Sequence, residues 1–248
     1  LGLLKPVNSD ILIKNIPSNL RDYDNHWFGL TVRARVIVYS KERINKNELS
    51  TYEDLASPKW KGRIVVRSSN NIYNQSLMAS IINANGIDIA LDWAKSVRGN
   101  MARKPRGNDR DQARAVASGI ADLAIINTYY LGLLENSTDS KDRNVAKKLG
   151  VFFPNQNNRG THINVSGGAV TASSKNVEQA LRFLEFLTDQ ENQKIFSSVN
   201  YEYPLKFNNT NSATLLGWGA FKSDNVHLSI LGKNNAEAVK LFDIARWE

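Results

Sequence analysis

The order of apolar and polar residues predicts that the first half of the chain alternates between strands and helices. The predicted strands are short β-branched or apolar runs, at residues 33–40, 64–66 and 122–126. The predicted helices have apolar residues at helical spacing, at residues 72–86, 89–97 and 108–118. A continuous apolar strand between helices is typical of an α/β domain whose sheet is covered on both faces.

The same pattern continues through the second half of the chain. Residues 167–172 are predicted to form a strand, and the expected helices cover residues 176–187, 190–199 and 236–245. Ser50 and Glu53 have the spacing of a capping box, which predicts a short helix that ends before Pro58.

The composition is that of a globular protein. The 248 residues are 42% hydrophobic and 23% charged, and no apolar run approaches the roughly 20 residues that span a bilayer. The first ten residues lack the basic start of a signal peptide, so we expect that a targeting segment has been removed or that the chain begins inside a longer protein. The absence of cysteine excludes disulfides, thiolate metal sites and thiol nucleophiles.

The net charge is +8, and basic residues are densest between residues 98 and 114. This segment has no aromatic residue to stack on bases, and Asp109 and Asp111 interrupt it. A solvated helix face with a few site arginines is therefore favoured over nucleic-acid binding.

Tyr129 and Tyr130 are the most informative candidates for chemistry. They follow the apolar run 122–126 and Asn127, so we expect them at the end of a strand. Phenolate oxygen suits a hard trivalent metal, and a chain with three histidines and no cysteine offers few softer ligands. The alternative is ordinary packing of the rings with the hydroxyls in water.

Four segments carry a family resemblance. They are PKWKGRIVVR (58–67), NIYNQS (71–76), GNDRDQARAVASGIADLAIINTYY (107–130) and YEYPL (201–205). In this order and spacing they resemble the periplasmic ferric-iron-binding proteins of bacterial ABC importers, within the extracellular solute-binding class. The third segment is the most specific, because it joins a helix start, a glycine stop, a strand and the paired tyrosines.

The resemblance implies an α/β, two-lobe periplasmic-binding-protein fold of the type II-like kind, with a metal cleft between the lobes. Residues 1–35 and 166–212 would belong to the first lobe, and residues 36–165 and 213–248 to the second. Members of the family carry a further segment before the position of Leu1. We therefore expect an incomplete first lobe here, and a further metal ligand outside this sequence.

For the site, the resemblance implies that Tyr129 and Tyr130 are paired Fe(III) ligands and that Tyr73, at a helix start, is the third. Neighbouring side chains on a regular strand point to opposite faces, so we expect the backbone to bend at the paired tyrosines. Three phenolates would balance the charge of Fe(III) and make a separate synergistic anion less necessary. Fe(II) remains an alternative cargo.

The resemblance gives weaker indications for other residues. Ser69, Asn108 and Asn127 align near positions that hold an anion or the ligand shell. Arg103 and Arg106 are candidates to balance phenolate charge from the cleft wall, and solvated arginines on a helix face are the alternative for both. We expect His162 at the surface.

The implied function is non-catalytic. The protein would be a periplasmic monomer that binds ferric iron and delivers it to an inner-membrane ABC permease, without nucleic acid as a partner. The alternative is a protein of the same fold that binds a small organic or anionic solute. An enzyme is disfavoured, because the sequence has no G-x-S-x-G, P-loop, G-x-G-x-x-G or H-E-x-x-H pattern.

Overall fold

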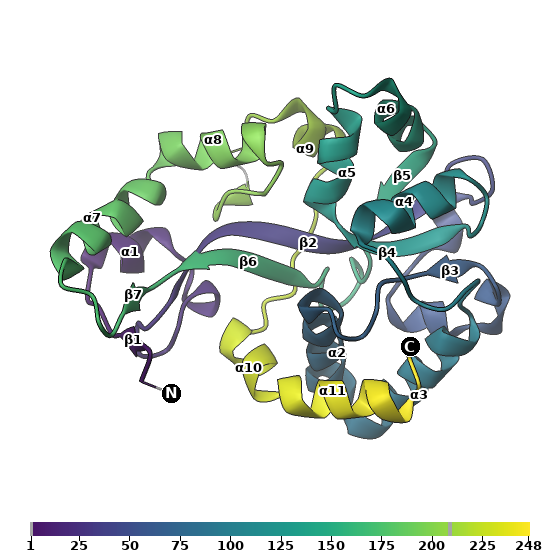
Figure 1. Ribbon diagram of the computed structural model, residues 1–248, viewed down its shortest axis with the longest axis horizontal. Helices are drawn as coiled ribbons and strands as arrows, with labels where there is room; N and C mark the ends of the chain where they lie inside the picture. The colour runs from purple at the N-terminus through teal and green to yellow at the C-terminus, as the bar shows by residue number, and fades with distance from the viewer. Residues whose placement is uncertain (1, 208–209) are drawn as a thin grey trace. The chain divides into compact units, whose positions relative to one another are not determined.

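The computed structural model describes residues 2–207 and 210–248, which form two compact units (Figure 1). Unit 1 comprises Leu1–Arg33, Asn164–Gly219 and Asn225–Ser229, and unit 2 comprises Ala34–Ile163, Ala220–Asp224 and Ile230–Glu248. The chain passes between the units within strands β2 and β6. Residues 213–219 and 225–229, which we assigned to the second lobe, group with unit 1.

The core of unit 2 is a mixed sheet in the order β3-β4-β2-β5. These strands are β3 (Ile64–Val65), β4 (Leu123–Asn127), β2 (Phe28–Ser40) and β5 (Leu149–Phe152). Strand β4 runs parallel to β3 and antiparallel to β2, with Ile126 opposite Val36 and Ile125 opposite Ile37. Every residue of β4 is buried, which agrees with the expectation from its unbroken apolar run.

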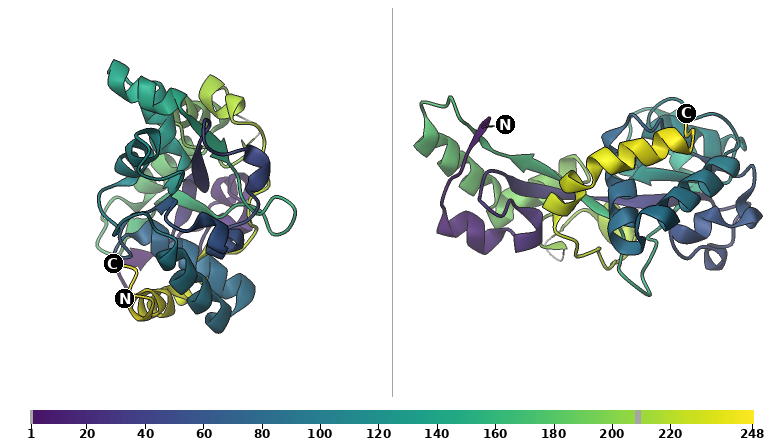
Figure 2. Two further views of the ribbon diagram at one scale, coloured as in Figure 1. Left: turned by 90° about the vertical axis from the view of Figure 1, so that its right-hand side faces the viewer. Right: turned by 90° about the horizontal axis from the view of Figure 1, so that it is seen from below.

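Helices cover the sheet of unit 2. They are α2 (Ile72–Asn85), α3 (Ile87–Gly99), α4 (Asp109–Ala117), α5 (Thr128–Glu135), α6 (Ser140–Lys147) and α11 (Asn235–Ile244). Helix α4 packs on β4, and α11 lies along α2 and α3, as the right-hand view in Figure 2 shows. The connections contain the 3-10 turns η2 (Lys46–Glu48), η3 (Glu53–Ala56) and η4 (Pro58–Trp60).

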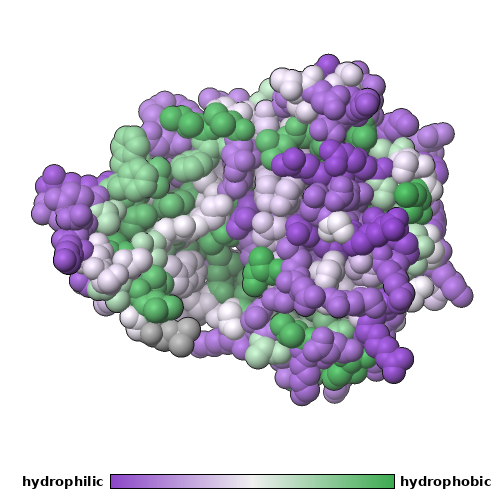
Figure 3. Space-filling view, viewed as in Figure 1, coloured by the Kyte–Doolittle hydropathy of each residue, from purple (hydrophilic) through white to green (hydrophobic). Residues whose placement is uncertain are grey.

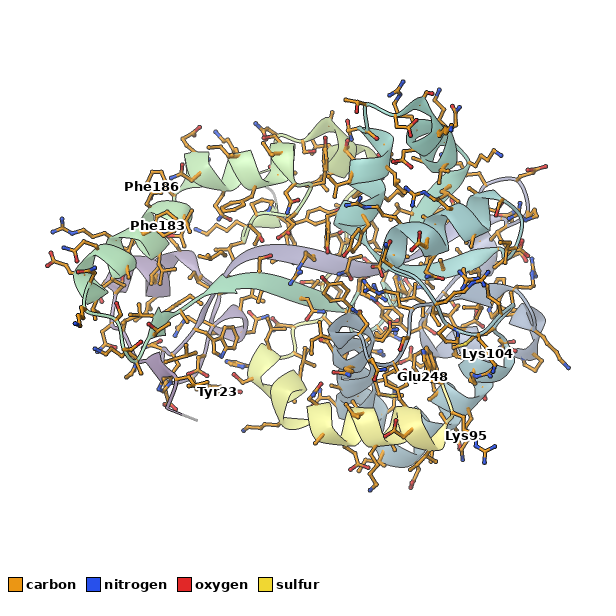
Figure 4. The ribbon with its side chains drawn as sticks, in the orientation of Figure 1. Tyr23, Lys95, Lys104, Phe183, Phe186 and Glu248 are labelled. Atoms are coloured by element: carbon orange, nitrogen blue, oxygen red, sulfur yellow. The ribbon has the colours of Figure 1, made fainter. Side chains whose placement is uncertain are left out.

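Unit 1 contains a small antiparallel pair, in which β1 (Leu4–Lys5) lies beside β7 (Val170–Thr171). Its other elements are α1 (Asp10–Asn15), η1 (Ser18–Leu20), β6 (Ile163–Gly168, which begins in unit 2), α7 (Val177–Leu187), α8 (Gln190–Val199), α9 (Ala213–Gly217) and the start of α10 (Leu228–Lys233). Apolar side chains gather over α7 and α8 in Figure 3, and Phe183 and Phe186 of α7 are exposed (Figure 4).

Most predicted elements are present, with two corrections. The capping box expected at Ser50 is wrong: the backbone oxygen of Ser50 and the backbone N–H of Tyr52 are both bonded to Asn155, and only the 3-10 turn η3 follows. The predicted strand 167–172 is instead the end of β6 followed by β7. In the described part of the chain, every helix is too short or too polar to cross a bilayer.

Candidate metal-binding site

The paired tyrosines lie in the first turn of a helix rather than on a strand, so our placement of them at a strand end is wrong. Strand β4 ends at Asn127, whose backbone is extended, and α5 begins at Thr128. Adjacent residues of an α-helix are only about 100° apart around its axis, so both side chains can reach one side. The rings of Tyr129 and Tyr130 lie close together, with 4.2 Å between their centroids.

Tyr73 reaches the same place from the first turn of α2. The side chain of Asn71 caps this helix by accepting a hydrogen bond from the backbone N–H of Tyr73 at 3.1 Å. The hydroxyl oxygens of Tyr73 and Tyr129 are 3.2 Å apart, and the Tyr130 side chain is hydrogen-bonded to Tyr129. Two oxygen ligands of one small ion lie about 3 Å apart, so this spacing is compatible with shared coordination.

We call Tyr73, Tyr129 and Tyr130 the tyrosine cluster, and Tyr129 at its centre keeps its proton at neutral pH in the metal-free protein. Burial raises the pKa of Tyr129, and its hydrogen bonds with Tyr130 and Tyr73 raise that pKa further. A cation that binds these oxygens must therefore displace protons, and the charge of the metal must supply the free energy for it.

Two arginines lie against Tyr73. The guanidinium carbons of Arg35 and Arg67 are 5.7 Å and 5.5 Å from the centroid of the Tyr73 ring. Both arginines pair with Asp109: Arg35 donates from Nη1 to Oδ2 at 2.7 Å, and Arg67 from Nη1 to Oδ1 at 3.4 Å. Two cations share one carboxylate, so a net positive charge remains beside the Tyr73 ring.

A third arginine lies against the other end of the cluster. Arg110, on the first turn of α4, places its guanidinium carbon 5.7 Å from the centroid of the Tyr130 ring. Positive charge therefore lies beside both outer rings of the cluster.

Arg35 is fully buried, and its hydrogen bonds join the elements that carry the tyrosines. Its Nη2 donates to Asn74 on α2 at 2.7 Å, and its Nη1 donates to Asn127 at the end of β4 at 3.2 Å. Asp109 also accepts from the backbone N–H of Asn127 at 2.8 Å. One buried polar network thus fixes the starts of α2, α4 and α5 relative to one another.

Asn127 belongs to this network, whereas Ser69 lies in a different contact. The side-chain Nδ2 of Asn127 is buried and has no hydrogen-bond partner among the described residues, which leaves a donor unused next to the start of α5. Ser69 instead donates to Glu248 Oε1 at 3.2 Å. The same oxygen of Glu248, a residue labelled in Figure 4, accepts from Ser68 Oγ at 2.6 Å and Asn70 Nδ2 at 2.7 Å.

Asn108 and Arg103 make their hydrogen bonds within or beside α4. The Asn108 side chain accepts from the backbone N–H groups of Arg110 and Asp111. The Asp111 carboxylate in turn accepts from the backbone N–H of Asn108, which completes a capping box. Arg103 Nη2 donates to Gln112 Oε1 at 3.0 Å.

The expectation of a surface position for His162 is wrong, because this side chain is fully buried. Burial, followed by the positive charges of Arg35 and Arg159, lowers the pKa of His162 to about 3. The ring is therefore neutral at neutral pH, and its Nε2 lies 3.1 Å from Ser76 Oγ.

A different metal candidate lies in unit 1. Asp22, Asp24 and His26 bring three ligand atoms within 4.8 Å of one another. The Asp22 carboxylate already accepts hydrogen bonds from the backbone N–H groups of Asp24 and His26 and contacts the His26 ring at 2.9 Å. These bonds hold a partly exposed turn, so the tyrosine cluster is the better candidate for a hard cation.

Sequence reasoning missed Arg35, Arg67, Asp109 and Glu248. Arg35 carried a usable signal, because a cation inside the apolar strand run 33–40 must find a buried partner. Glu248 carried none, because its partners lie about 180 positions away.

Comparison with known proteins identifies the family. The sequence matches the bacterial extracellular solute-binding protein family over residues 1–222. The chain belongs to this family. It is 48% identical over 247 residues to iron uptake protein A1 of Synechocystis sp., an alignment that covers 100% of this chain and 69% of that protein. Identity to the major ferric iron-binding protein of Neisseria meningitidis is 32% over 180 residues, 72% of this chain and 52% of that protein.

Solved structures of family members agree with the fold. Trichodesmium IdiA (FutA), in complex with iron and citrate, matches with a TM-score of 0.97 and 51% identity, over 100% of this chain and 78% of that one. The ferric binding protein of Campylobacter jejuni matches with a TM-score of 0.93 and 48% identity, over 98% of this chain and 78% of that one. The resemblance drawn from the sequence and the predicted α/β periplasmic-binding fold are confirmed.

Proposed function

We propose that this protein binds ferric iron through the phenolate oxygens of Tyr73, Tyr129 and Tyr130 and delivers it, in the periplasm, to an inner-membrane ABC permease. The observation that carries the proposal is the 3.2 Å approach of the Tyr73 and Tyr129 hydroxyls, with Tyr130 hydrogen-bonded to the second. Membership of the solute-binding family, with relatives named for iron uptake and ferric-iron binding, supports the same cargo.

The ligand chemistry favours Fe(III) over Fe(II). Hard trivalent iron prefers anionic oxygen, and three phenolates balance its three positive charges. Arg35 and Arg67 place positive charge beside Tyr73, which would attract an iron-bound phenolate, and Asn127 offers a buried N–H donor to the ligand shell. Ser69 acts indirectly, because its bond to Glu248 holds the loop from which α2 begins. We expect the protein to act as a monomer that binds and releases iron without catalysing a reaction.

Visible absorption tests this proposal. Titration of the purified protein with Fe(III)-nitrilotriacetate should produce a phenolate-to-iron charge-transfer band that saturates at one equivalent. Tyr129→Phe should weaken iron binding by orders of magnitude and shift the band, and Tyr73→Phe should also alter the spectrum. Tyr23→Phe, at an exposed tyrosine of unit 1, is the matched control and should leave the spectrum unchanged. Wild-type spectra and affinity in both site variants would overturn the ligand assignment.

The alternative cargo is a small organic or anionic solute. The unused Nδ2 donor of Asn127 beside the start of α5 is the observation that favours an anion. A protein that stays colourless with Fe(III) and yet binds such a solute would select this alternative.

A further inference from the structure

The densest basic segment of the sequence forms a groove along α4. The lining of a cavity of about 470 Å³ includes Arg103, Arg106, Arg114, Asp111 and Ile120. We call it the arginine groove. None of its lining residues is a proposed iron ligand, and α4 presents a hydrophilic face in Figure 3.

A buried side chain holds the groove in shape. Gln112, on α4, is fully buried and accepts a hydrogen bond from Arg103 Nη2 at 3.0 Å. Its Nε2 donates to the backbone oxygens of Arg106 at 2.6 Å and of Asn108 at 3.0 Å. The loop that carries Arg103 and Arg106 is therefore fixed before any ligand arrives, which lowers the entropy cost of binding.

The positive charge of the groove is only partly compensated. Arg114 pairs with Asp142 at 2.9 Å and with Asp111 at 3.4 Å. Among the residues that the structure describes, Arg103, in contrast, donates to uncharged oxygens alone, those of Gln112 and the Lys104 backbone. Within residues 2–207 and 210–248, the Arg106 guanidinium makes no hydrogen bond or ion pair, and the buried Nε of Arg103 has no partner.

The two uncompensated arginines repel each other. Burial, followed by the positive charge of Arg106, holds the pKa of Arg103 below its usual value, and Asp111 opposes this effect. An anion between the two guanidinium groups would relieve the repulsion and satisfy the unused donors.

We propose that the arginine groove binds a small oxyanion that carries at least two negative charges, of the polycarboxylate or phosphate type. Planar guanidinium groups bind such oxygens in pairs, and the volume of the groove accommodates a small molecule. The site is independent of iron binding, so either proposal can fail without the other.

Isothermal titration calorimetry with citrate and with inorganic phosphate, at low ionic strength, tests the groove and distinguishes the two anion types. Arg103→Gln and Arg106→Gln should each weaken binding by roughly tenfold. Lys104→Gln removes the same charge from the same loop but is not in the groove lining, so it should change the affinity by less than about twofold. Because citrate could also enter the tyrosine cluster, Tyr129→Phe should retain the measured binding.

Three outcomes would overturn the proposal. The first is that neither anion binds, and the second is an equal loss in Lys104→Gln and Arg106→Gln, which would indicate general charge attraction. The third is loss of the measured citrate binding in Tyr129→Phe, which would place the anion at the tyrosine cluster instead of the groove. Arg106 is exposed, so its variant is expected to fold normally and keeps the test decisive.

Discussion

The hydroxyl oxygens of Tyr73 and Tyr129 lie 3.2 Å apart although 56 positions separate them in the sequence. The topology of the sheet explains this approach. Strands β3 and β4 are parallel neighbours, and each leads into a helix, α2 or α5, that carries a tyrosine in its first turn. The carboxyl ends of parallel strands meet at one edge of a sheet, which is where α/β proteins place their ligands.

Iron binding should release protons. Burial and hydrogen bonding raise the pKa of Tyr129, so this phenol is neutral across the neutral pH range in the free protein. Each phenolate ligand then releases one proton, and the affinity for Fe(III) should rise with pH by up to about tenfold per unit for each ligand. Titration in a weakly buffered solution measures the protons directly. We expect about three per iron ion, after correction for the chelator, and fewer than two would contradict coordination by three phenolates.

The positive charge of Arg67 should tune the iron site. Arg67→Gln removes one of the two cations beside Tyr73 but leaves the buried pair of Arg35 with Asp109 in place. With less stabilisation of the phenolate, the charge-transfer band should move to longer wavelength and iron affinity should fall by roughly tenfold. Lys95→Gln, at an exposed position of α3, is the control. Equal spectra for Arg67→Gln and wild type would show that this cation does not act on the phenolate.

The buried pair of Arg35 with Asp109 should matter for stability. Asp109→Asn keeps the shape of the side chain but leaves the Arg35 guanidinium without its carboxylate in a fully buried position. Loss of one partner of such a pair costs about 3–5 kcal/mol of unfolding free energy. Urea denaturation followed by circular dichroism measures this cost. Glu178→Gln breaks an exposed pair with Arg182 and should cost less than about 1 kcal/mol. Similar midpoints for the two variants would contradict the structural importance of the buried pair.

Acid should destabilise the protein through His162. The pKa of this ring is about 3 in the folded protein, below the ordinary value of about 6.5 expected for the unfolded chain. Between these values only the unfolded chain takes up the proton, so stability is lost as pH falls from about 6.5, by up to about 1.4 kcal/mol per pH unit.

His162→Gln should flatten this dependence. The variant removes the titrating ring while the neighbouring Arg35, Arg159 and Tyr52 are unchanged. Unfolding free energies at pH 7 and pH 5 provide the comparison. The same slope in both proteins would mean that other groups cause the acid sensitivity.

The sequence predicted the elements of the site better than its contacts. Helix α2 was visible because apolar residues recur at helical spacing after Asn71 and Gly86 follows its end. The transition from β4 to α5 was predicted too late in the chain, because the aromatic residues after Asn127 have strand propensity and the buried network fixes where the helix begins. The partners of Arg35 lie on three separate segments, and no local pattern specifies which of the available polar residues it will meet.

The contact of Glu248 with Ser68, Ser69 and Asn70 has a consequence for the order of events during synthesis. The loop that begins the helix of Tyr73 leaves the ribosome long before Glu248 has been added. The hydrogen bonds between this loop and Glu248 can therefore form only after residue 248 has been synthesised. A nascent chain that contains all three tyrosines but not residue 248 still lacks the hydrogen bonds that hold the loop before Tyr73 in place.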